Sequence, residues 1–239
     1  MRCGNVVGYQ NIESADGSFS GGLTFLTIGG TDGQFTLADF KAIGMDPYND
    51  FVQFLSTDNA APYVYAVYLD KDTYGEDLEG WWDYFDVGGT PLNEQSFANG
   101  TAFLVANGSG NQISFQYAGQ VATGTDCSIV IPEGTGSPFI CNPTPVALTL
   151  GQVTAVGMDP YNDFFQYLSP SDASPITYAV YLDKDTYGED LEGWWDYFDV
   201  GGTPLNEEPL AAGGALLGAV GSGNEIVVTF PDPLAKKAE

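Results

Sequence analysis

The sequence contains no histidine, and only six of its 239 residues are lysine or arginine. Without histidine, neither a Ser-His nor a Cys-His nucleophilic pair can form, and a structural zinc site is not expected. The scarcity of positive charge also excludes the basic face that binds nucleic-acid phosphates. Paired carboxylates are plentiful, but a small domain of strands and short turns offers little room for a deep cleft. We therefore expect neither an enzyme nor a nucleic-acid-binding protein.

Long apolar runs are also missing, so we expect no segment inserted in a membrane. The 32 aspartates and glutamates give a net charge of −26, which anionic lipids would repel. Such a surface needs cations to relieve its self-repulsion. Two interpretations follow: an acid-rich surface suited to salty water outside a cell, or specific binding of Ca²⁺.

Cysteine is scarce, with three in the chain. Cys127 and Cys141 flank the segment CSIVIPEGTGSPFIC, whose two short extended runs surround a Pro/Gly/Ser turn. We predict a disulfide between them, which would stabilise the fold by roughly 3 kcal/mol on the chain-entropy model. Cys3 then remains unpaired, and other pairings or three buried thiols stay open as alternatives.

The main feature that is present is a tandem repeat. The thirty residues 65–94, YAVYLDKDTYGEDLEGWWDYFDVGGTPLNE, recur unchanged at 178–207, and we call this segment the repeated block. At the same offset of 113 residues, 43 of the 51 positions from Gly44 to residue 94 are identical. We therefore expect two domains, 1–122 and 123–239, with a boundary near 120–126. Residues 35–117 should superpose on residues 148–230.

Aromatic and alternating runs, bounded by Gly, Asp, Asn and Pro, predict strands throughout each copy. The segments TLAD at 36–39 and TLGQ at 149–152 each match a capping box, which predicts short helices near 37–43 and 150–156. The predicted fold class is all-β with minor helix. It consists of two tandem β-sandwich-like domains, each with a short helix.

A diverged strand carries a second pattern. Every second residue of one stretch is shared between the copies, namely Ala98, Gly100, Ala102, Leu104 and Ala106, whereas the residues between them differ. A period of two predicts a strand with one fixed face. We expect the fixed face to pack against a second sheet or a bulky neighbour such as Trp82, and the drifting face to be exposed.

The repeated block contains an acidic loop, DKDTYGED. Its D-x-D spacing, followed by glycine and two more acids, is typical of loops that supply oxygen ligands to Ca²⁺. The predicted ligands are Asp70, Asp72, Glu76 and Asp77, with Asp183, Asp185, Glu189 and Asp190 in the second copy. The loop is not an EF-hand, because Tyr74 and Trp81 stand where that motif needs acidic or amide side chains. The alternative is a solvated turn, and the MDPYND segments at 45–50 and 158–163 also fit turn chemistry without a metal.

The segment GWWDYFD completes the block. On a strand, alternation would place Trp81, Asp83 and Phe85 on one face and Trp82, Tyr84 and Asp86 on the other. Both faces carry carboxylates, so both cannot be wholly buried, and we predict that Trp81, Tyr84, Trp194 and Tyr197 make contacts with other subunits. Core packing of the tryptophans and stacking on a sugar ring are the alternatives. The identity of the two blocks reflects either a recent duplication or the same surface used twice.

The order GYQNI, GWWD and GTAFLV…SFQYAGQV resembles the C-terminal patterns of large paralogous families of uncharacterised secreted bacterial surface proteins. The resemblance covers most of the first copy, whereas the second copy departs at its ends (ATGTDC, VVTFPDP). It transfers no activity or site residue and implies an exported structural role.

We therefore predict an extracellular or cell-surface structural subunit that self-assembles into a fibre or a surface layer. Exposed strand edges could be completed by a neighbouring copy. The alternative function is a Ca²⁺-dependent adhesive or carbohydrate-binding pair of modules, with a glycan as partner.

Overall fold

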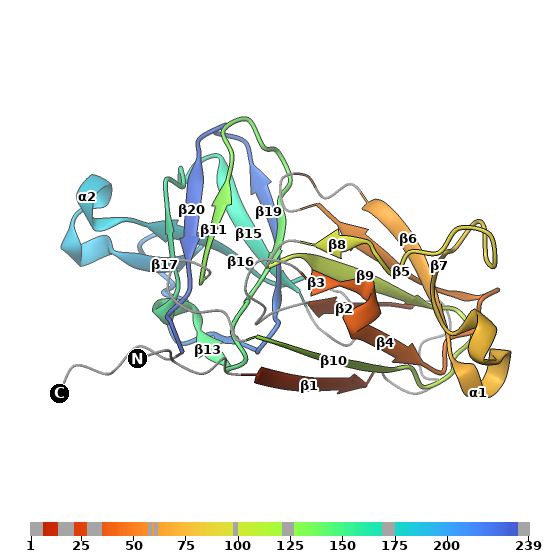
Figure 1. Ribbon diagram of the computed structural model, residues 1–239. Helices are drawn as coiled ribbons and strands as arrows, with labels where there is room; N and C mark the ends of the chain where they lie inside the picture. Colours follow the sequence, from red (N-terminus) through yellow and green to blue (C-terminus); the bar gives the residue numbers. More distant parts are fainter. Residues whose placement is uncertain are drawn as a thin grey trace, which may run out of the picture.

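The computed structural model describes residues 7–13, 22–27, 35–56, 59, 62–97, 100–120, 127–168 and 175–233. Most of these residues lie in β-strands, and short helical turns connect some of them (Figure 1). The expected all-β class with minor helix is confirmed. Cys3, Ala98 and residues 121–126 of the expected domain boundary lie outside the described residues.

The first repeat forms three sheets. Its elements are β1 (Val7–Glu13), β2 (Gly22–Thr27), β3 (Phe35–Thr36), η1 (Leu37–Asp39), β4 (Phe40–Ile43), β5 (Asp50–Leu55), β6 (Pro62–Leu69), α1 (Lys71–Tyr74), η2 (Glu76–Leu78), β7 (Gly80–Asp83), β8 (Ser96–Phe97), β9 (Ala102–Asn107) and β10 (Ser114–Gln120). The strand orders are β1-β10-β4, β2-β9-β5-β6-β7 and β3-β8, and all pairs are antiparallel.

The second repeat has the same three sheets. Its elements are β11 (Ser128–Ile131), β12 (Phe139–Cys141), β13 (Leu148–Thr149), η4 (Leu150–Gln152), β14 (Thr154–Val156), β15 (Asp163–Leu168), β16 (Pro175–Leu182), α2 (Lys184–Tyr187), η5 (Glu189–Leu191), β17 (Gly193–Asp196), β18 (Pro209–Leu210), β19 (Ala215–Val220) and β20 (Ile226–Thr229). The strand orders β11-β20-β14, β12-β19-β15-β16-β17 and β13-β18 match those of the first repeat. The expected equivalence of the two copies is therefore confirmed in secondary structure and topology, and Figure 1 shows the repeats side by side.

Each repeat has its own core between its three-stranded and its five-stranded sheet. In the first repeat, Phe40 and Phe115 from the small sheet meet Trp81, Phe54 and Phe103 from the large sheet, with ring centroids 5.3–6.1 Å apart in the direct contacts. All five side chains are fully buried. Two facing sheets with interdigitated side chains make each repeat β-sandwich-like.

A third apolar cluster joins the two repeats. It is formed by the buried residues Leu55, Ala102, Phe139, Cys141, Leu168 and Ala215, with Leu104 and Leu217 packed against it. Six of these residues form three pairs of equivalent positions in the two copies: Leu55 with Leu168, Ala102 with Ala215, and Leu104 with Leu217. The contacts are reciprocal, because β12 contacts β9 and β19 contacts the equivalent β2. The repeats therefore meet through a pseudo-two-fold interface, as two subunits do in an isologous dimer.

This interface explains the period-two pattern on β9. The shared residues Ala102 and Leu104 belong to the inter-repeat cluster and thus pack against a second sheet, as predicted, although that sheet belongs to the other repeat. The drifting face was expected to be exposed, and that expectation is wrong. Phe103 and Val105 are fully buried in the core of their own repeat. The core-facing residues of β9 can differ between the repeats because each core packs independently of the other. The residues that face the other repeat must fit the equivalent residues there, which explains why they are the same in both copies.

The predicted helices near 37–43 and 150–156 are shorter than expected. The capping boxes are present: the Thr36 amide donates to Asp39 Oδ2 at 3.4 Å, and the Thr149 amide donates to Gln152 Oε1 at 2.9 Å. They begin single 3₁₀ turns, η1 and η4, after which the chain continues as β4 and β14. The pairing of these strands with β10 and β20 overrides the local helix signal.

The predicted disulfide between Cys127 and Cys141 is wrong, because both residues are buried thiols that are not bonded to each other. The segment between them does not form a hairpin. Its strands enter different sheets, β11 beside β20 and β12 beside β19. Cys127 consequently lies in the core of the second repeat, whereas Cys141 lies in the inter-repeat cluster, and its Sγ contacts the Thr101 carbonyl oxygen at 3.8 Å.

Candidate interaction surface

The first tryptophan of each repeated block lies in the core. Trp81 and Trp194 are both 0% exposed, so the prediction that they contact other subunits is wrong. The Trp81 indole N–H donates to the Phe40 carbonyl oxygen at 2.6 Å, and the Tyr68 ring meets the indole edge-on with centroids 5.5 Å apart. The alternation that assigned Trp81 and Phe85 to one face fails because β7 ends at Asp83.

Beyond β7, the chain forms a loop that projects an aromatic side chain into solvent. The loop is closed by the bridge between Trp82 and Pro91 and by the Asp83 amide, which donates to the Thr90 carbonyl oxygen at 2.9 Å. The Asp83 carboxylate accepts from the Phe85 amide at 2.8 Å. These contacts hold Phe85 at the surface, where its side chain is 75% exposed.

Phe85 belongs to a surface aromatic cluster on the outer face of the five-stranded sheet. We define this cluster as Phe51, Tyr65, Tyr84 and Phe85. Its ring centroids are 5.9 Å apart for Phe51–Tyr65, 4.8 Å for Phe51–Tyr84, 5.4 Å for Tyr65–Phe85 and 5.3 Å for Tyr84–Phe85. Tyr84, one of the predicted contact residues, is half-buried in this cluster, and its hydroxyl donates to the Tyr48 carbonyl oxygen at 3.3 Å.

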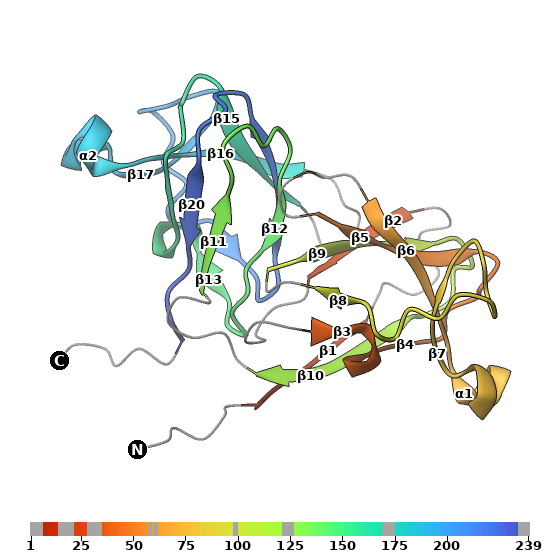
Figure 2. The ribbon, with the colours of Figure 1, turned by 45° about the horizontal axis from the view of Figure 1, so that its top comes forward.

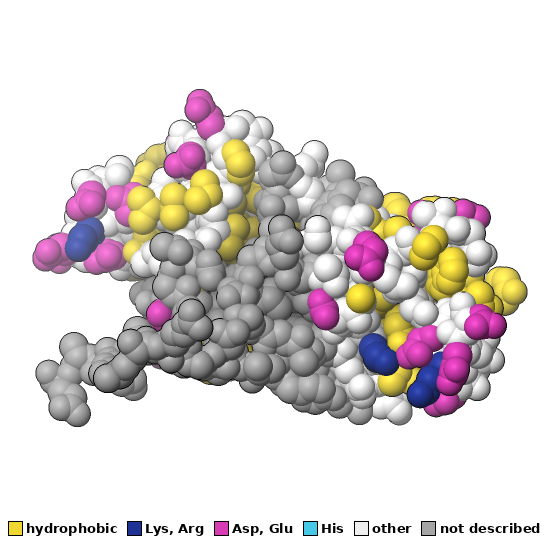
Figure 3. Space-filling view, in the orientation of Figure 1, with side chains coloured by type: hydrophobic (Ala, Val, Ile, Leu, Met, Phe, Trp, Pro, Cys, Tyr) yellow, Lys and Arg dark blue, Asp and Glu magenta, His cyan; other side chains and the backbone are white. Residues whose placement is uncertain are grey.

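The second repeat carries the same cluster, formed by Phe164, Tyr178, Tyr197 and Phe198. The corresponding distances are 5.6, 4.7, 5.5 and 5.3 Å, and Phe198 is 76% exposed. Tyr197 donates to the Tyr161 carbonyl oxygen at 3.1 Å, which reproduces the role of Tyr84. Figure 3 shows apolar side chains at the surface of both repeats, with acidic side chains near them. The molecule thus presents the same aromatic surface twice.

The MDPYND segments form the turns beside these clusters. The Asp46 carboxylate accepts from the Tyr48 amide at 2.8 Å and from the Asn49 side-chain amide at 3.1 Å. Asp50 is fully buried and accepts from the Asp46 amide at 2.8 Å and from the Ser109 amide and hydroxyl at 2.8 and 2.7 Å. Turn chemistry without a metal accounts for these carboxylates. The turn exposes 85% of Tyr48 at its tip.

The acidic loop does not bring its four predicted calcium ligands together. Asp70 is the N-cap of α1, and its Oδ1 accepts from the Thr73 amide at 2.9 Å; Asp183 does the same for Thr186. Within the described ranges, no group of three or more acidic or cysteine side chains is arranged to hold a metal ion. Calcium binding therefore stays a prediction without geometric support.

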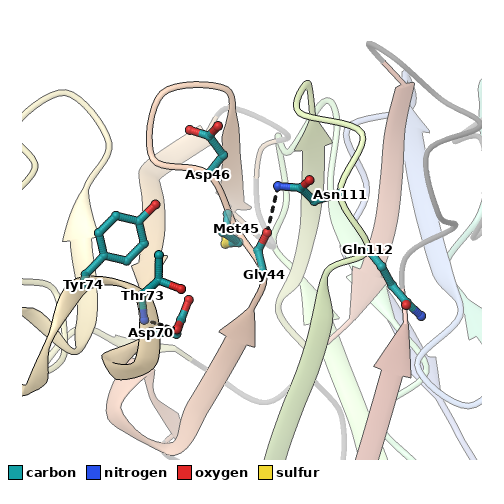
Figure 4. A pocket seen from close by; sticks show the side chains of 8 residues that line it. All are labelled: Gly44, Met45, Asp46, Asp70, Thr73, Tyr74, Asn111 and Gln112. Atoms are coloured by element: carbon teal, nitrogen blue, oxygen red, sulfur yellow. Dashed lines mark hydrogen bonds between the residues drawn. The ribbon is translucent and has the colours of Figure 1, made fainter.

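Asp70 instead lines an open groove of about 400 Å³ next to the MDPYND turn. Figure 4 shows Asp70, Thr73 and Tyr74 from the acidic loop, with Asp46 contributed by the turn after β4. Partial burial and the nearby Asp46 carboxylate raise the pKa of Tyr74 above its usual value, so its hydroxyl stays protonated. Asp72, Glu76 and Asp77 do not line this groove.

Sequence reasoning missed Phe51, Phe85 and Tyr65, together with their counterparts Phe164, Phe198 and Tyr178. A signal was available for two of the three positions, because Tyr65 and Phe85 lie in the unchanged block and the glycine pair after Phe85 indicates a loop rather than a strand.

No protein-family model matches the sequence, and comparison with curated proteins gave no match. Across the described residues, no helix is both long and apolar enough to cross a bilayer.

Proposed function

We propose that this protein is a non-catalytic extracellular structural subunit that self-assembles into a fibre or a surface layer through its two aromatic clusters. The observation that carries the proposal is the repetition of one solvent-exposed aromatic cluster with nearly the same ring distances in both repeats. A chain with two similar adhesive surfaces can contact two neighbours, and such contacts produce open filaments or sheets when they do not close into a ring.

The inter-repeat interface supports this proposal. Phe51 and Leu55 lie four residues apart on β5, so their side chains share the outer face of the sheet. Leu55 packs against the other repeat, whereas Phe51 belongs to the exposed aromatic cluster. One end of this face is therefore already paired with its equivalent, and the aromatic end lies on the same face, with the half-buried Gln53 between Phe51 and Leu55. A cluster from another copy of the chain is the occupant that this pattern favours.

Loss of the two exposed rings tests the proposal. We expect Phe85→Ser/Phe198→Ser to abolish ordered polymers in electron micrographs and to lower light scattering, while the melting temperature stays unchanged because both rings are mostly exposed. Val130→Ser/Val156→Ser is the matched control, since these side chains are 53% and 50% exposed but lie outside the clusters. Monodisperse particles of the wild type under all conditions, or unimpaired polymers of the double variant, would refute the proposal.

The alternative function is a Ca²⁺-dependent adhesive or carbohydrate-binding pair of modules. The exposed ring of Tyr48, with Asp46 and Asn49 beside it, favours this candidate, because aromatic faces flanked by polar groups stack on sugars. It predicts that Tyr48→Ala/Tyr161→Ala abolishes retention on immobilised glycans. It also predicts that excess chelator at fixed ionic strength lowers the melting temperature, because a ligand bound only to the folded state stabilises that state.

A further inference from the structure

A second pair of equivalent sites lies away from the aromatic clusters. In the first repeat, a groove is lined by Ala38, Lys41, Tyr68, Glu79, Gly80 and Asn93. In the second repeat, the residues at the same offset, Gly151, Thr154, Tyr181, Glu192, Gly193 and Asn206, line an equivalent groove. We call these the first-repeat and second-repeat grooves. Their volumes are about 370 and 470 Å³.

The floor of both grooves is built in the same way. Asn93 Oδ1 accepts from the Trp81 amide at 2.9 Å, and Asn206 Oδ1 accepts from the Trp194 amide at 2.9 Å. Because the tryptophans are anchored in the core, these bonds fix both asparagine side chains. The same asparagine hydrogen bond therefore fixes one wall of each groove.

The first-repeat groove contains an ammonium group that the chain itself supplies. Lys41 Nζ lies 3.0 Å from Glu79 Oε1. The Tyr68 hydroxyl donates to the same carboxylate oxygen at 3.2 Å. The hydrogen bond from Lys41 lowers the pKa of Glu79. The Glu79 carboxylate, oriented by the Tyr68 hydroxyl, thus holds an ammonium group.

The second-repeat groove keeps the equivalent carboxylate and tyrosine, Glu192 and Tyr181, but lacks the lysine. Thr154 stands at the position of Lys41, and among the described residues no ion pair involves Glu192. Burial, and next the neighbouring Glu192 carboxylate, raise the pKa of the Tyr181 hydroxyl, so Tyr181 and Glu192 keep the arrangement of Tyr68 and Glu79. The duplicate of an occupied ammonium site is therefore open in the second repeat.

We propose that the second-repeat groove binds a primary ammonium group in trans, with the Glu192 carboxylate as its counter-ion. The first-repeat groove is the internal template, because Glu79, the equivalent of Glu192, holds the Lys41 ammonium there. The net charge of −26 attracts cations to this surface. The ammonium comes either from a lysine side chain of another copy of the chain or from a separate amine. This proposal does not depend on the aromatic clusters.

The test is an NMR titration of the full chain, at a dilution where light scattering shows monomers, with n-butylammonium chloride. We expect saturable shifts of the Gly193 amide and the Asn206 side-chain amide, and none at Gly80 and Asn93. Tetramethylammonium chloride at equal ionic strength should not reproduce the shifts, because it has no N–H donor. Glu192→Gln should weaken the binding about twofold to fivefold, as expected for a partly exposed ion pair.

Two reciprocal variants make the test specific. Thr154→Lys should fill the second-repeat groove and abolish the saturable shifts there, and it should fold, because the first repeat carries lysine at this position. Lys41→Thr should open the first-repeat groove and produce new saturable shifts at Gly80 and Asn93. Equal shifts in both wild-type grooves, an absence of saturation, or binding unaffected by Thr154→Lys would overturn the proposal.

A dilution series without added amine identifies the source of the ammonium. Shifts at Gly193 and Asn206 that grow with protein concentration, and that Thr154→Lys removes, support binding in trans with a lysine of another copy as the source. Saturation by n-butylammonium without any concentration dependence supports the groove as a site for a separate amine.

Discussion

The indole N–H of Trp81 donates a hydrogen bond of 2.6 Å to the carbonyl oxygen of Phe40, whose own ring stacks on the indole with centroids 5.3 Å apart. Trp194 makes the equivalent bond of 2.7 Å to the Val153 carbonyl oxygen. Each repeated block thus joins the edge of its five-stranded sheet to the opposite sheet. Because Trp81 and Trp194 lie fully buried in the cores, recent duplication explains their identity better than a shared binding surface does. Phe85 is exposed, so packing within the repeat does not explain why this residue is unchanged.

Replacing Trp81 with alanine should destabilise the first repeat by about 3–5 kcal/mol, because it removes a large buried ring together with its hydrogen bond to the Phe40 carbonyl oxygen. Denaturant unfolding followed by circular dichroism measures the change. Phe85→Ala is the control and should alter the free energy of unfolding by no more than about 0.5 kcal/mol. If Trp81→Ala unfolds no more readily than this control, Trp81 does not anchor the core.

The repeat, the all-β class and the positions of most turns could be predicted from the sequence, because strand periodicity and turn chemistry are local properties. The burial of Trp81 could not, since it depends on where β7 ends and on Phe40, 41 residues earlier. The missing disulfide has a similar cause: strand order decides that Cys127 and Cys141 enter different sheets. The aromatic clusters escaped prediction because they combine β5, β6 and the loop after β7.

The buried carboxylates of Asp50 and Asp163 should be essential to the turns that precede them. Asp163 accepts from the Asp159 amide at 2.8 Å and from the Ser222 amide and hydroxyl at 2.9 and 2.7 Å. Asp163→Ala leaves these donors unsatisfied and should cost about 1–3 kcal/mol or more. Thermal unfolding measures the loss. The exposed Glu133→Ala is the control, and equal melting temperatures of the two variants would contradict this role.

One cross-strand pair in the core differs between the repeats: two valines in the first repeat correspond to a phenylalanine and a glycine in the second. We expect that the first core can be converted to the phenylalanine–glycine pair by mutation. Val52 pairs with Val105 in the first core, whereas Phe165 pairs with Gly218 in the second, where the Pro138 side chain and the phenylalanine ring fill the space over the glycine. Val52→Phe should overpack the first core and Val105→Gly should leave a cavity in it. The double variant should be more stable than the sum predicts, with a coupling of about 0.5–3 kcal/mol in a double-mutant cycle. Strict additivity would show that the two positions do not compensate each other.

Stability should fall in alkaline solution because of Tyr68. Burial, and next the adjacent Glu79 carboxylate, raise the pKa of this hydroxyl above its usual value. The folded state therefore holds its proton more tightly than the unfolded state, so the stabilisation is complete below about pH 10 and is lost as the pH rises further. Tyr68→Phe should flatten the alkaline part of a plot of unfolding free energy against pH. An unchanged slope in Tyr68→Phe would contradict the assignment.

Assembly should strengthen with salt. Each repeated block carries eight acidic residues and one lysine, so two approaching copies repel each other. Raising the salt from about 0.1 M to about 1 M shortens the Debye length from about 10 Å to about 3 Å and leaves the apolar contacts of the aromatic clusters in place. Light scattering and sedimentation should therefore show more polymer at high salt. Phe85→Ser/Phe198→Ser should remain monomeric at every salt concentration, because screening removes repulsion but supplies no contact. CaCl₂ and MgCl₂ at equal ionic strength should promote assembly equally, because screening does not depend on which divalent cation is present. Polymers that dissolve as salt is added would show that ion pairs, and not the aromatic clusters, hold the copies together.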